Sequence, residues 1–225
     1  MAERVAVTGA SGVVGGAVAR SLLARGDEVV AVQRGPLPAE LAEIGARGHR
    51  ADVAGPFDAL VEAFAGCDAV VHAAARVDIT GPWEEYERVN VVGTRNVVEA
   101  ARRAGVARFV LVSSPSVAHA GHPLVGADAE PADPTRARGH YSRSKAMAEV
   151  EALAVADDRL AVTVVRPHLV WGPGDTQLTE RIIDRARSGR LVTIGSGAAL
   201  IDTTYIDNAG SAIAAAVDQI GRAHV

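Results

Sequence analysis

Three glycines spaced three residues apart follow the first apolar run of the chain. Arg4 to Thr8 is a short apolar segment that predicts a strand, and Gly9, Gly12 and Gly15 come directly after it. A helical pattern then runs from Gly12 to Arg25. Glycines at these positions allow a tight turn and a close approach of the backbone to a pyrophosphate, which the free N–H groups of the helix start would bind. The segment therefore predicts a dinucleotide-binding β-α-β unit, and a glycine-rich turn without a ligand is the alternative.

The same alternation of strand and helix patterns continues to about residue 166. Continuously apolar runs predict the strands, and longer stretches of helical spacing predict the helices. The expected strands are Glu28 to Gln33, a weak one before Asp52, Asp68 to Ala73, Arg108 to Ser113 and Ala161 to Arg166; the expected helices are Phe57 to Phe64, Trp83 to Ala104 and Tyr141 to Ala156. Such runs fit a parallel sheet with helices on both faces. The predicted fold class is α/β, a doubly wound parallel sheet of the Rossmann type.

The pattern changes after Arg166. The remaining elements are a helix at Thr179 to Ser188, a short strand at Leu191 to Ile194, a segment at Ile201 to Ile206 and a last helix from Asp207 to Asp218. We expect residues 1–166 to form the dinucleotide-binding domain and residues 167–219 to be the start of a truncated C-terminal substrate region. Residues 220–225 can be encoded by a common sequencing adapter, which predicts a non-native tail; a genuine polar tail is the alternative.

The composition excludes several classes of protein. The 225 residues are 48% hydrophobic and 22% charged, which is typical of a globular protein. A net charge of -4 leaves no basic surplus for a nucleic-acid backbone, so no nucleic-acid partner is expected. The apolar runs are far shorter than the ~20 residues of a spanning helix, and the N-terminus lacks a signal-sequence pattern, which predicts a cytoplasmic protein. The single Cys67 is expected in the core. Both a monomer and a homodimer are compatible with the sequence.

Residues at the ends of the predicted strands extend the cofactor site. Gln33-Arg34-Gly35 closes the second strand without a carboxylate, so Arg34 is placed to pair with the 2′-phosphate of NADP; a solvated arginine is the alternative. NADP is thus favoured over NAD. Small side chains after the fourth strand are expected to line the adenosine pocket, and His72 to be a satisfied core histidine. The cofactor-binding residues predicted in this part of the chain are Gly9, Ser11, Gly12, Val13, Val14, Gly15, Arg34, Asp52, Val53, Ala73 and Ala74.

Tyr141 and Lys145 are four residues apart on a predicted helix, so their side chains lie on one face about one turn apart. A neighbouring cation favours the phenolate and lowers the pKa of a tyrosine. An exposed helix pair is the alternative. The position of the pair, one strand after Ser113-Ser114, favours the catalytic interpretation.

Several motifs along the chain together resemble one family. They are Thr8-Gly9-x-x-Gly12-x-x-Gly15, Asp52-Val53, His72-Ala73-Ala74-Ala75, Asn90-Val91-Val92-Gly93-Thr94, Ser113-Ser114, Tyr141-x-x-x-Lys145, Arg166-Pro167 and Gly172-Pro173-Gly174-Asp175. Their combination resembles the extended short-chain dehydrogenase/reductases, of the NAD-dependent epimerase/dehydratase superfamily, to about Asp218. Segments 79–90, 113–117 and 205–208 look most like the 3β-hydroxysteroid dehydrogenase branch, and sugar-nucleotide epimerases are the second interpretation.

The resemblance implies an NAD(P)-dependent oxidoreductase that transfers hydride between the nicotinamide and a secondary alcohol or ketone, with sterol-like ring alcohols as one substrate class. It implies that Tyr141 exchanges a proton with the substrate, that Lys145 holds the nicotinamide ribose and lowers the pKa of Tyr141, and that Ser114 bonds the reacting oxygen. Asn90 is either the anchor of a proton-relay water or a helix-packing amide, and Pro167 lies along the nicotinamide. A nucleotide-sugar epimerase or dehydratase and a non-catalytic NADP-binding regulator are the alternatives.

Two other kinds of site are not expected. His119-x-x-His122 lies in a Gly/Pro loop with no cysteine partner, which argues against a metal site. Ser113-Ser114-Pro115 lacks the Gly-x-Ser-x-Gly elbow of a serine hydrolase.

Overall fold

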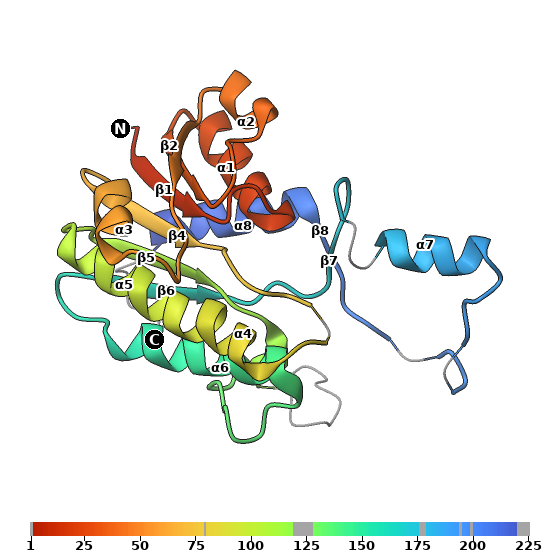
Figure 1. Cartoon of the computed structure of the whole chain (residues 1–225). Coiled ribbons are helices and arrows are strands. Elements are labelled where there is room, and N and C mark those ends of the chain that lie inside the picture. The colour runs from red at the N-terminus through yellow and green to blue at the C-terminus, as the bar shows by residue number, and fades with distance from the viewer. Residues whose placement is uncertain are drawn as a thin grey trace.

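Six parallel strands form one sheet, which confirms the predicted fold class (Figure 1). The structure is a computed structural model that describes residues 2–78, 80–118, 128–175, 179–193, 195–198 and 200–219. The strands are β1 (Arg4–Thr8), β2 (Glu28–Gln33), β3 (Arg47–Arg50), β4 (Ala69–His72), β5 (Arg108–Val112) and β6 (Ala161–Val165). They lie in the order β3-β2-β1-β4-β5-β6. The order reverses between β1 and β4, and ligands of such sheets bind at this switch point, beyond the carboxyl ends of the strands.

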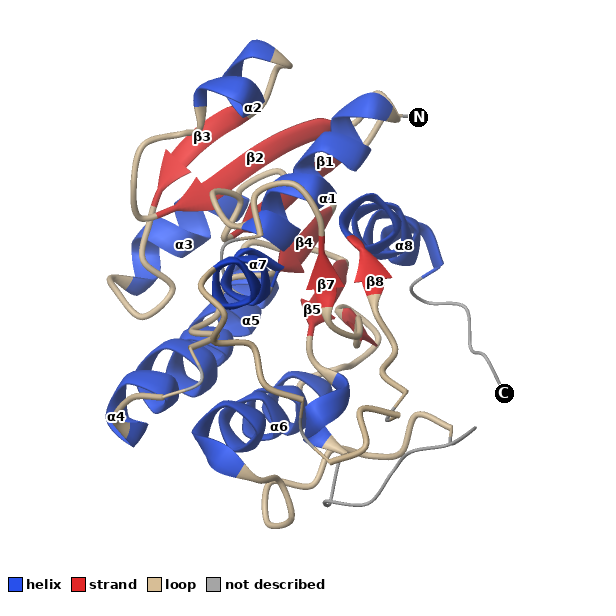
Figure 2. Cartoon of the chain, turned by 90° about the vertical axis from the view of Figure 1, so that its right-hand side faces the viewer, coloured by secondary structure: helices blue, strands red, loops and turns tan. Residues whose placement is uncertain are grey.

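Helices cover both faces of the sheet (Figure 2). One face carries α1 (Val13–Ala24), α2 (Ala39–Glu43) and α8 (Ile206–Gln219), and the other carries α3 (Phe57–Phe64), α5 (Gly93–Arg103) and α6 (Gly139–Ala154). Alternate residues of one strand enter opposite layers: Val5 and Val7 pack with α1 and α8, whereas Ala6 packs with α3 and α5. Burial on both faces explains why the strand sequences are continuously apolar.

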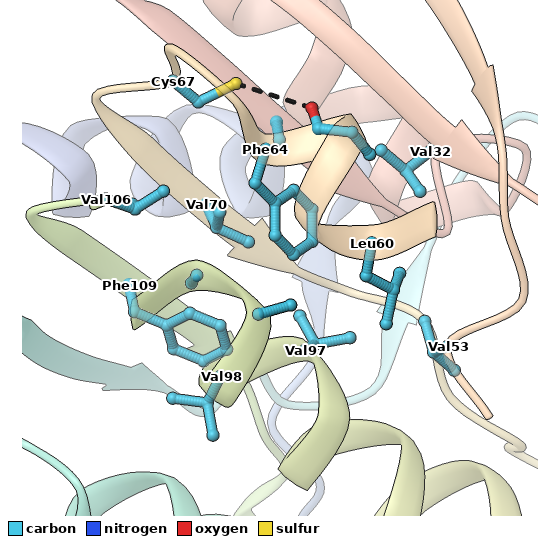
Figure 3. Packing of buried hydrophobic residues seen from close by; sticks show 14 of the residues in the cluster. Val32, Val53, Leu60, Phe64, Cys67, Val70, Val97, Val98, Val106 and Phe109 are labelled. Atoms are coloured by element: carbon cyan, nitrogen blue, oxygen red, sulfur yellow. Dashed lines mark hydrogen bonds between the residues drawn. The ribbon is translucent and has the colours of Figure 1, made fainter. Parts of the chain in front are cut away.

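The aromatic residues of the two core clusters lie on the α3 and α5 side of the sheet. Phe64 of α3 and Phe109 of β5 are fully buried there, beside Val97 and Val98 of α5 (Figure 3). Cys67 belongs to the same cluster, and its Sγ lies 3.8 Å from the carbonyl oxygen of Ala63. Cys67 is thus the small core residue that the sequence predicts.

The helix predicted over Trp83 to Ala104 is continuous but not uniform. It consists of α4 (Trp83–Tyr86), a π-helical turn at Glu87–Val92 and α5. The π-helical turn carries Asn90, whose side chain is almost completely buried. Such turns often occur at functional sites because they redirect side chains within a helix.

The chain after β6 is arranged differently from the expectation. Two short strands, β7 (Val170–Trp171) and β8 (Thr204–Tyr205), pair in parallel, and β7 is not predicted from the sequence. The strand expected at Leu191 to Ile194 is wrong for the described residues 191–193, which form no strand because no neighbouring strand pairs with them; the side chains of Leu191 and Val192 are exposed. Residues 220–225 lie outside the described residues.

The last two helices differ in how they contact the sheet. Within its described residues, α7 (Thr179–Arg187) buries no side chain, and it projects away from the sheet (Figure 1). In contrast, α8 returns to the sheet and packs against α1, where Ile213, Ala214 and Val217 enter the core. Part of the region after residue 166 thus completes a helical layer of the sheet, and the division into residues 1–166 and 167–219 stays a prediction.

Gly210 allows the close contact between α8 and α1. A Cβ atom at this position would lie 2.9 Å from the carbonyl oxygen of Ala17. We therefore expect Gly210→Val to lower the free energy of unfolding by about 1–3 kcal/mol, because the added side chain forces the helices apart. Urea unfolding measures the change. Ser211→Val adds the same side chain at the exposed neighbouring position and is the control; an equal loss in both variants would contradict this explanation.

His72 links β4 to two other elements. Its Nδ1 lies 2.7 Å from Oγ1 of Thr8, and its Nε2 lies 3.0 Å from Oγ1 of Thr94. Burial and, second, the charge of Lys145 lower the pKa of His72 from 6.5 to about 3. His72 is therefore a neutral, fully bonded core histidine, as the sequence predicts.

The lowered pKa of His72 makes stability depend on pH. Between pH 6.5 and about 3 the unfolded chain binds a proton at His72 that the folded chain does not bind. The free energy of unfolding should therefore fall as the pH falls through this window, by up to about 1.4 kcal/mol per pH unit from this group. Urea unfolding from pH 4 to pH 7 tests it against His72→Gln, which keeps a donor and an acceptor but does not titrate. Parallel curves for both proteins would rule out this role of His72.

Candidate functional site

The turn between β1 and α1 requires glycine at two of the predicted positions. Gly9 has a φ of +71°, and a Cβ atom there would lie 2.7 Å from Cα of Ala74. A Cβ atom on Gly15 would overlap the carbonyl oxygen of Gly9. The two glycines thus bring the turn close to the segment after β4 and seat α1 directly against the turn.

The N-terminus of α1 opens onto this turn. Gly12 precedes the helix in an extended conformation, and no described side chain caps it. The first N–H groups of a helix lack intrahelical partners and carry partial positive charge, which attracts an anion. Val13 and Val14 contribute backbone groups to this first turn.

A cavity of about 250 Å³ lies over the carboxyl ends of β1, β2 and β4, next to the helix N-terminus. Eight of the predicted cofactor-binding residues line it: Gly9, Ser11, Gly12, Arg34, Asp52, Val53, Ala73 and Ala74. Six other predicted cofactor-binding residues lie outside its lining: Val13, Val14, Gly15, Tyr141, Lys145 and Pro167. Ala75 also lines it, as expected for the small side chains after the fourth strand, and the prediction does not include the other four lining residues, Val32, Gln33, Ala51 and Val89. Most of these adjoin predicted residues, but Val89 lies on the π-helical turn, which no sequence signal indicates.

The far end of the cavity is polar and cationic. Gln33 is 5% exposed, and its Oε1 has no hydrogen-bond partner among the described residues. The exposed Arg34 lies beside it, and the carbonyl oxygen of Arg34 accepts a hydrogen bond from Nε of Arg50 at 2.7 Å. Asp52 is engaged locally, since its Oδ1 accepts from the backbone N–H of Ala54 at 3.0 Å. The glycine turn and the unpartnered amide oxygen of Gln33 together fit a dinucleotide, whose ribose hydroxyls are hydrogen-bond donors.

A second group of polar residues lies farther along the same edge of the sheet, where β5 meets α6. Tyr141 and Lys145 both project from α6, and Ser114 follows β5. A side-chain hydrogen bond joins Tyr141 to Ser114. Lys145 is almost completely buried, and its Nζ donates to the carbonyl oxygen of Val112 at 2.7 Å. The structure thus brings together three of the four predicted catalytic residues.

Burial changes the acidity of both titratable groups of this cluster. It lowers the pKa of Lys145 from 10.5 to about 8, although the carboxylate of Glu149 raises it. It raises the pKa of Tyr141, and the hydrogen bond with Ser114 offsets only part of that rise. The sequence predicts a lowered pKa for Tyr141 instead. The difference has a physical reason, since burial of the phenol outweighs its polar contacts and the ammonium of Lys145 is bonded to a backbone carbonyl.

Asn90, the fourth predicted catalytic residue, makes structural contacts. Its Oδ1 accepts from the backbone N–H of Arg76 at 2.7 Å, and its Nδ2 donates to the carbonyl oxygen of Arg76 and to Oγ of Ser144. These bonds connect the segment after β4 to α6, next to Tyr141. The geometry fits the helix-packing amide, which is the second interpretation given above.

The remaining predicted residues lie at the margin of the site. Pro167 is half-buried two residues after the end of β6, and Nδ1 of His168 lies 4.0 Å from a carboxylate oxygen of Asp202. His119 and His122 lie outside the described residues. In the described part of the chain, no three His, Cys, Asp or Glu side chains gather as a metal would require. Nor does any helix described here have the length and apolarity to cross a membrane.

Known proteins match both the sequence and the fold. Residues 5–224 match the profile of the NAD dependent epimerase/dehydratase family. The chain is 44% identical over 212 residues to a 2-alkyl-3-oxoalkanoate reductase of Stenotrophomonas maltophilia, with 93% of this chain and 63% of the relative covered. It is 35% identical over 219 residues to a 3-beta-hydroxysteroid dehydrogenase of Mycolicibacterium neoaurum, with 91% of this chain and 58% of the relative covered. The second relative agrees with the branch that the motifs indicate.

The structure of MoeE5 in complex with UDP-glucose and NAD has the same fold, with a TM-score of 0.82 and 32% identity over 97% of this chain and 73% of that one. The chain spans less than two thirds of the length of the curated relatives named above. The profile match, the sheet order and the glycine turn agree, and the chain belongs to the NAD dependent epimerase/dehydratase family.

Proposed function

We propose that this chain forms the cofactor-binding part of an NAD(P)-dependent oxidoreductase that interconverts a ketone and a secondary alcohol. The observation that carries the proposal is the grouping of Ser114, Tyr141 and Lys145 at the sheet edge that also holds the dinucleotide cavity. A proton donor, a hydroxyl group and a buried cation are the groups that carbonyl reduction needs from a protein.

The cavity and the helix N-terminus would hold the cofactor. The backbone around Gly9, Ser11 and Gly12 would bind the pyrophosphate, and Gln33 and Arg34 would contact the adenosine ribose. When bound, the nicotinamide supplies or accepts the hydride.

Tyr141 would act as the proton donor in ketone reduction. Its raised pKa keeps the phenol protonated at neutral pH, so a proton is available for the substrate oxygen as negative charge develops on it. Ser114, already bonded to Tyr141, would donate a hydrogen bond to that same oxygen. The ammonium of Lys145 would stabilise the phenolate that proton transfer leaves behind.

The names of two relatives support a proposal for the substrate class. These names, 2-alkyl-3-oxoalkanoate reductase and 3-beta-hydroxysteroid dehydrogenase, describe a carbonyl or hydroxyl carbon in a largely apolar molecule. We infer that this chain acts on the same class, with sterol-like ring alcohols and alkyl-substituted 3-oxo acids as the substrates to test.

A nucleotide-sugar epimerase or dehydratase is the second candidate, because MoeE5 was solved with UDP-glucose and NAD. The two candidates differ in cofactor turnover. A net oxidoreductase consumes added cofactor in proportion to product, whereas an epimerase keeps its cofactor bound and shows no net consumption.

Replacing the phenol tests the proposed chemistry. Tyr141→Phe should lower kcat for ketone reduction about 100-fold or more, because the proton donor is lost. Cofactor affinity should stay within about twofold, since Tyr141 lies outside the cavity lining. Steady-state kinetics and fluorescence titration of the cofactor measure the two effects.

The matched control is Tyr86→Phe, which removes the hydroxyl of a buried tyrosine that donates to the carbonyl oxygen of Asp78. This variant should lose stability and keep most of its turnover. A Tyr141→Phe enzyme with unchanged kcat would end the proposal.

The cofactor preference is also a proposal. We infer that NADP is preferred, because the end of β2 carries no carboxylate to repel the 2′-phosphate and Arg34 lines the cavity there. Arg34→Ala should raise the Kd of NADP about tenfold, as expected for the loss of a charge-assisted hydrogen bond, and should change the Kd of NAD less than about twofold. The control is Arg47→Ala, because Arg47 lies at the end of β3 that is remote from Arg34. Equal effects on both cofactors would disprove a role of Arg34 in the preference.

A further inference from the structure

Glu149 is a buried charged residue that the proposed chemistry does not use. It is 2% exposed and lies on α6 one turn after Lys145 and two turns after Tyr141. The three side chains therefore share one face of the helix. A buried carboxylate is costly unless it is paired and hydrogen-bonded, so its retention in this position calls for a physical account.

Both carboxylate oxygens of Glu149 are bonded. Its Oε2 accepts from Oγ of Ser113 at 2.7 Å and from Nε of Arg166 at 3.1 Å, and its Oε1 pairs with Nη2 of Arg166. Arg166 in turn donates through Nη1 to the carbonyl oxygen of Glu130 at 2.7 Å. One carboxylate thus connects α6 to the carboxyl ends of both β5 and β6.

Three consecutive residues at the end of β5 contact three turns of α6. The carbonyl oxygen of Val112 accepts from Lys145, the hydroxyl of Ser113 donates to Glu149, and the side chain of Ser114 bonds Tyr141. A displacement of α6 against β5 would disturb all three contacts together. The pair of Glu149 and Arg166 adds a contact to this connection in which both partners are charged, and such bonds are among the strongest in proteins.

We propose that Glu149 and Arg166 are positioning residues, which hold α6 against the ends of β5 and β6 and so set the placement and charge of Lys145 beside Tyr141. This inference rests on the proposed function for its kinetic consequences only. The dependence of the Lys145 titration on Glu149 can be measured without a substrate.

The charged and titratable groups around Lys145 come from three elements. His72 of β4 is neutral at physiological pH, Tyr141 lies on α6 itself, and Arg166, directly after β6, is bound to Glu149. The carboxylate of Glu149 raises the pKa of Lys145 and opposes the lowering by burial. Loss of this negative charge should therefore lower the pKa of Lys145 further, so that its ammonium gives up its proton at a lower pH.

Lys145 is the only lysine in the sequence, which allows a direct test. Protein labelled with ¹³C at the lysine ε carbon gives a single lysine side-chain resonance, whose titration reports this one amine. We expect the Glu149→Gln substitution to move the titration to lower pH. Glu151→Gln, which removes a carboxylate of the same helix that pairs with Arg95 at the surface, should leave it in place. An unmoved Lys145 titration in Glu149→Gln would overturn the proposal.

Kinetics extend the test to the reaction. In Glu149→Gln, kcat for ketone reduction should fall about tenfold at neutral pH with less than a threefold change in KM, and the alkaline limb of the kcat profile should move to lower pH. If the wild-type protein reduces no ketone while the Lys145 titration still moves, the proposed function fails and the positioning role stands. If the wild-type protein reduces a ketone but the Lys145 titration does not move in Glu149→Gln, the positioning role fails and the proposed function stands.

A double variant distinguishes positioning from a purely structural role. Removing one member of a buried ion pair destabilises a protein, whereas replacing both members by apolar residues of similar size often restores stability. We expect Glu149→Met/Arg166→Met to recover much of the thermal stability lost in Arg166→Met alone, with kcat still reduced and the Lys145 titration still shifted. Recovery of kcat and of the wild-type Lys145 titration together with stability would show that the pair serves folding alone.

Discussion

All six strands of the sheet run in the same direction, and this constraint determines where the polar residues meet. Parallel pairing places every carboxyl end at one edge, so Gly9 after β1, Arg34 after β2, Ala73 after β4 and Ser114 after β5 lie along a single border. The cavity lies where the strand order reverses, between β1 and β4. Parallel strands are joined by crossover helices, and α8, which follows the last strand of the sheet, covers the same face as α1.

Burial of ionisable groups costs free energy in this arrangement. His72, Lys145 and Glu149 lie almost completely out of solvent along the boundary of β4, β5 and α6. Each is accommodated in a different way: His72 stays neutral, Lys145 has a lowered pKa and a carbonyl partner, and Glu149 is paired with Arg166. Perturbed ionisable groups of this kind cluster at functional sites, because a tuned proton affinity is what acid–base chemistry requires.

Membership in the family accounts for the cofactor chemistry more directly than for the substrate. Relatives named as a reductase and a dehydrogenase match this chain in sequence, and a structure solved in complex with UDP-glucose and NAD shares its fold. One fold can serve many substrates because the residues around the substrate differ while the cofactor edge is kept. In this chain the segment between β7 and β8 includes the exposed apolar side chains of Ile182, Leu191 and Val192, which is unlike the packed sheet region.

The sequence alone determined the parallel α/β fold, the glycine turn and the pair of Tyr141 and Lys145, because each depends on local spacing along the chain. It did not indicate the π-helical turn that directs Asn90 to Arg76, the missing strand at residues 191–193, or the raised pKa of Tyr141. Only the tertiary structure decided the partners of Glu149, since Ser113 and Arg166, directly after β5 and β6, are 36 and 17 residues away in the sequence. Burial and long-range pairing are properties of the packed chain, and no local pattern encodes which charges will meet there.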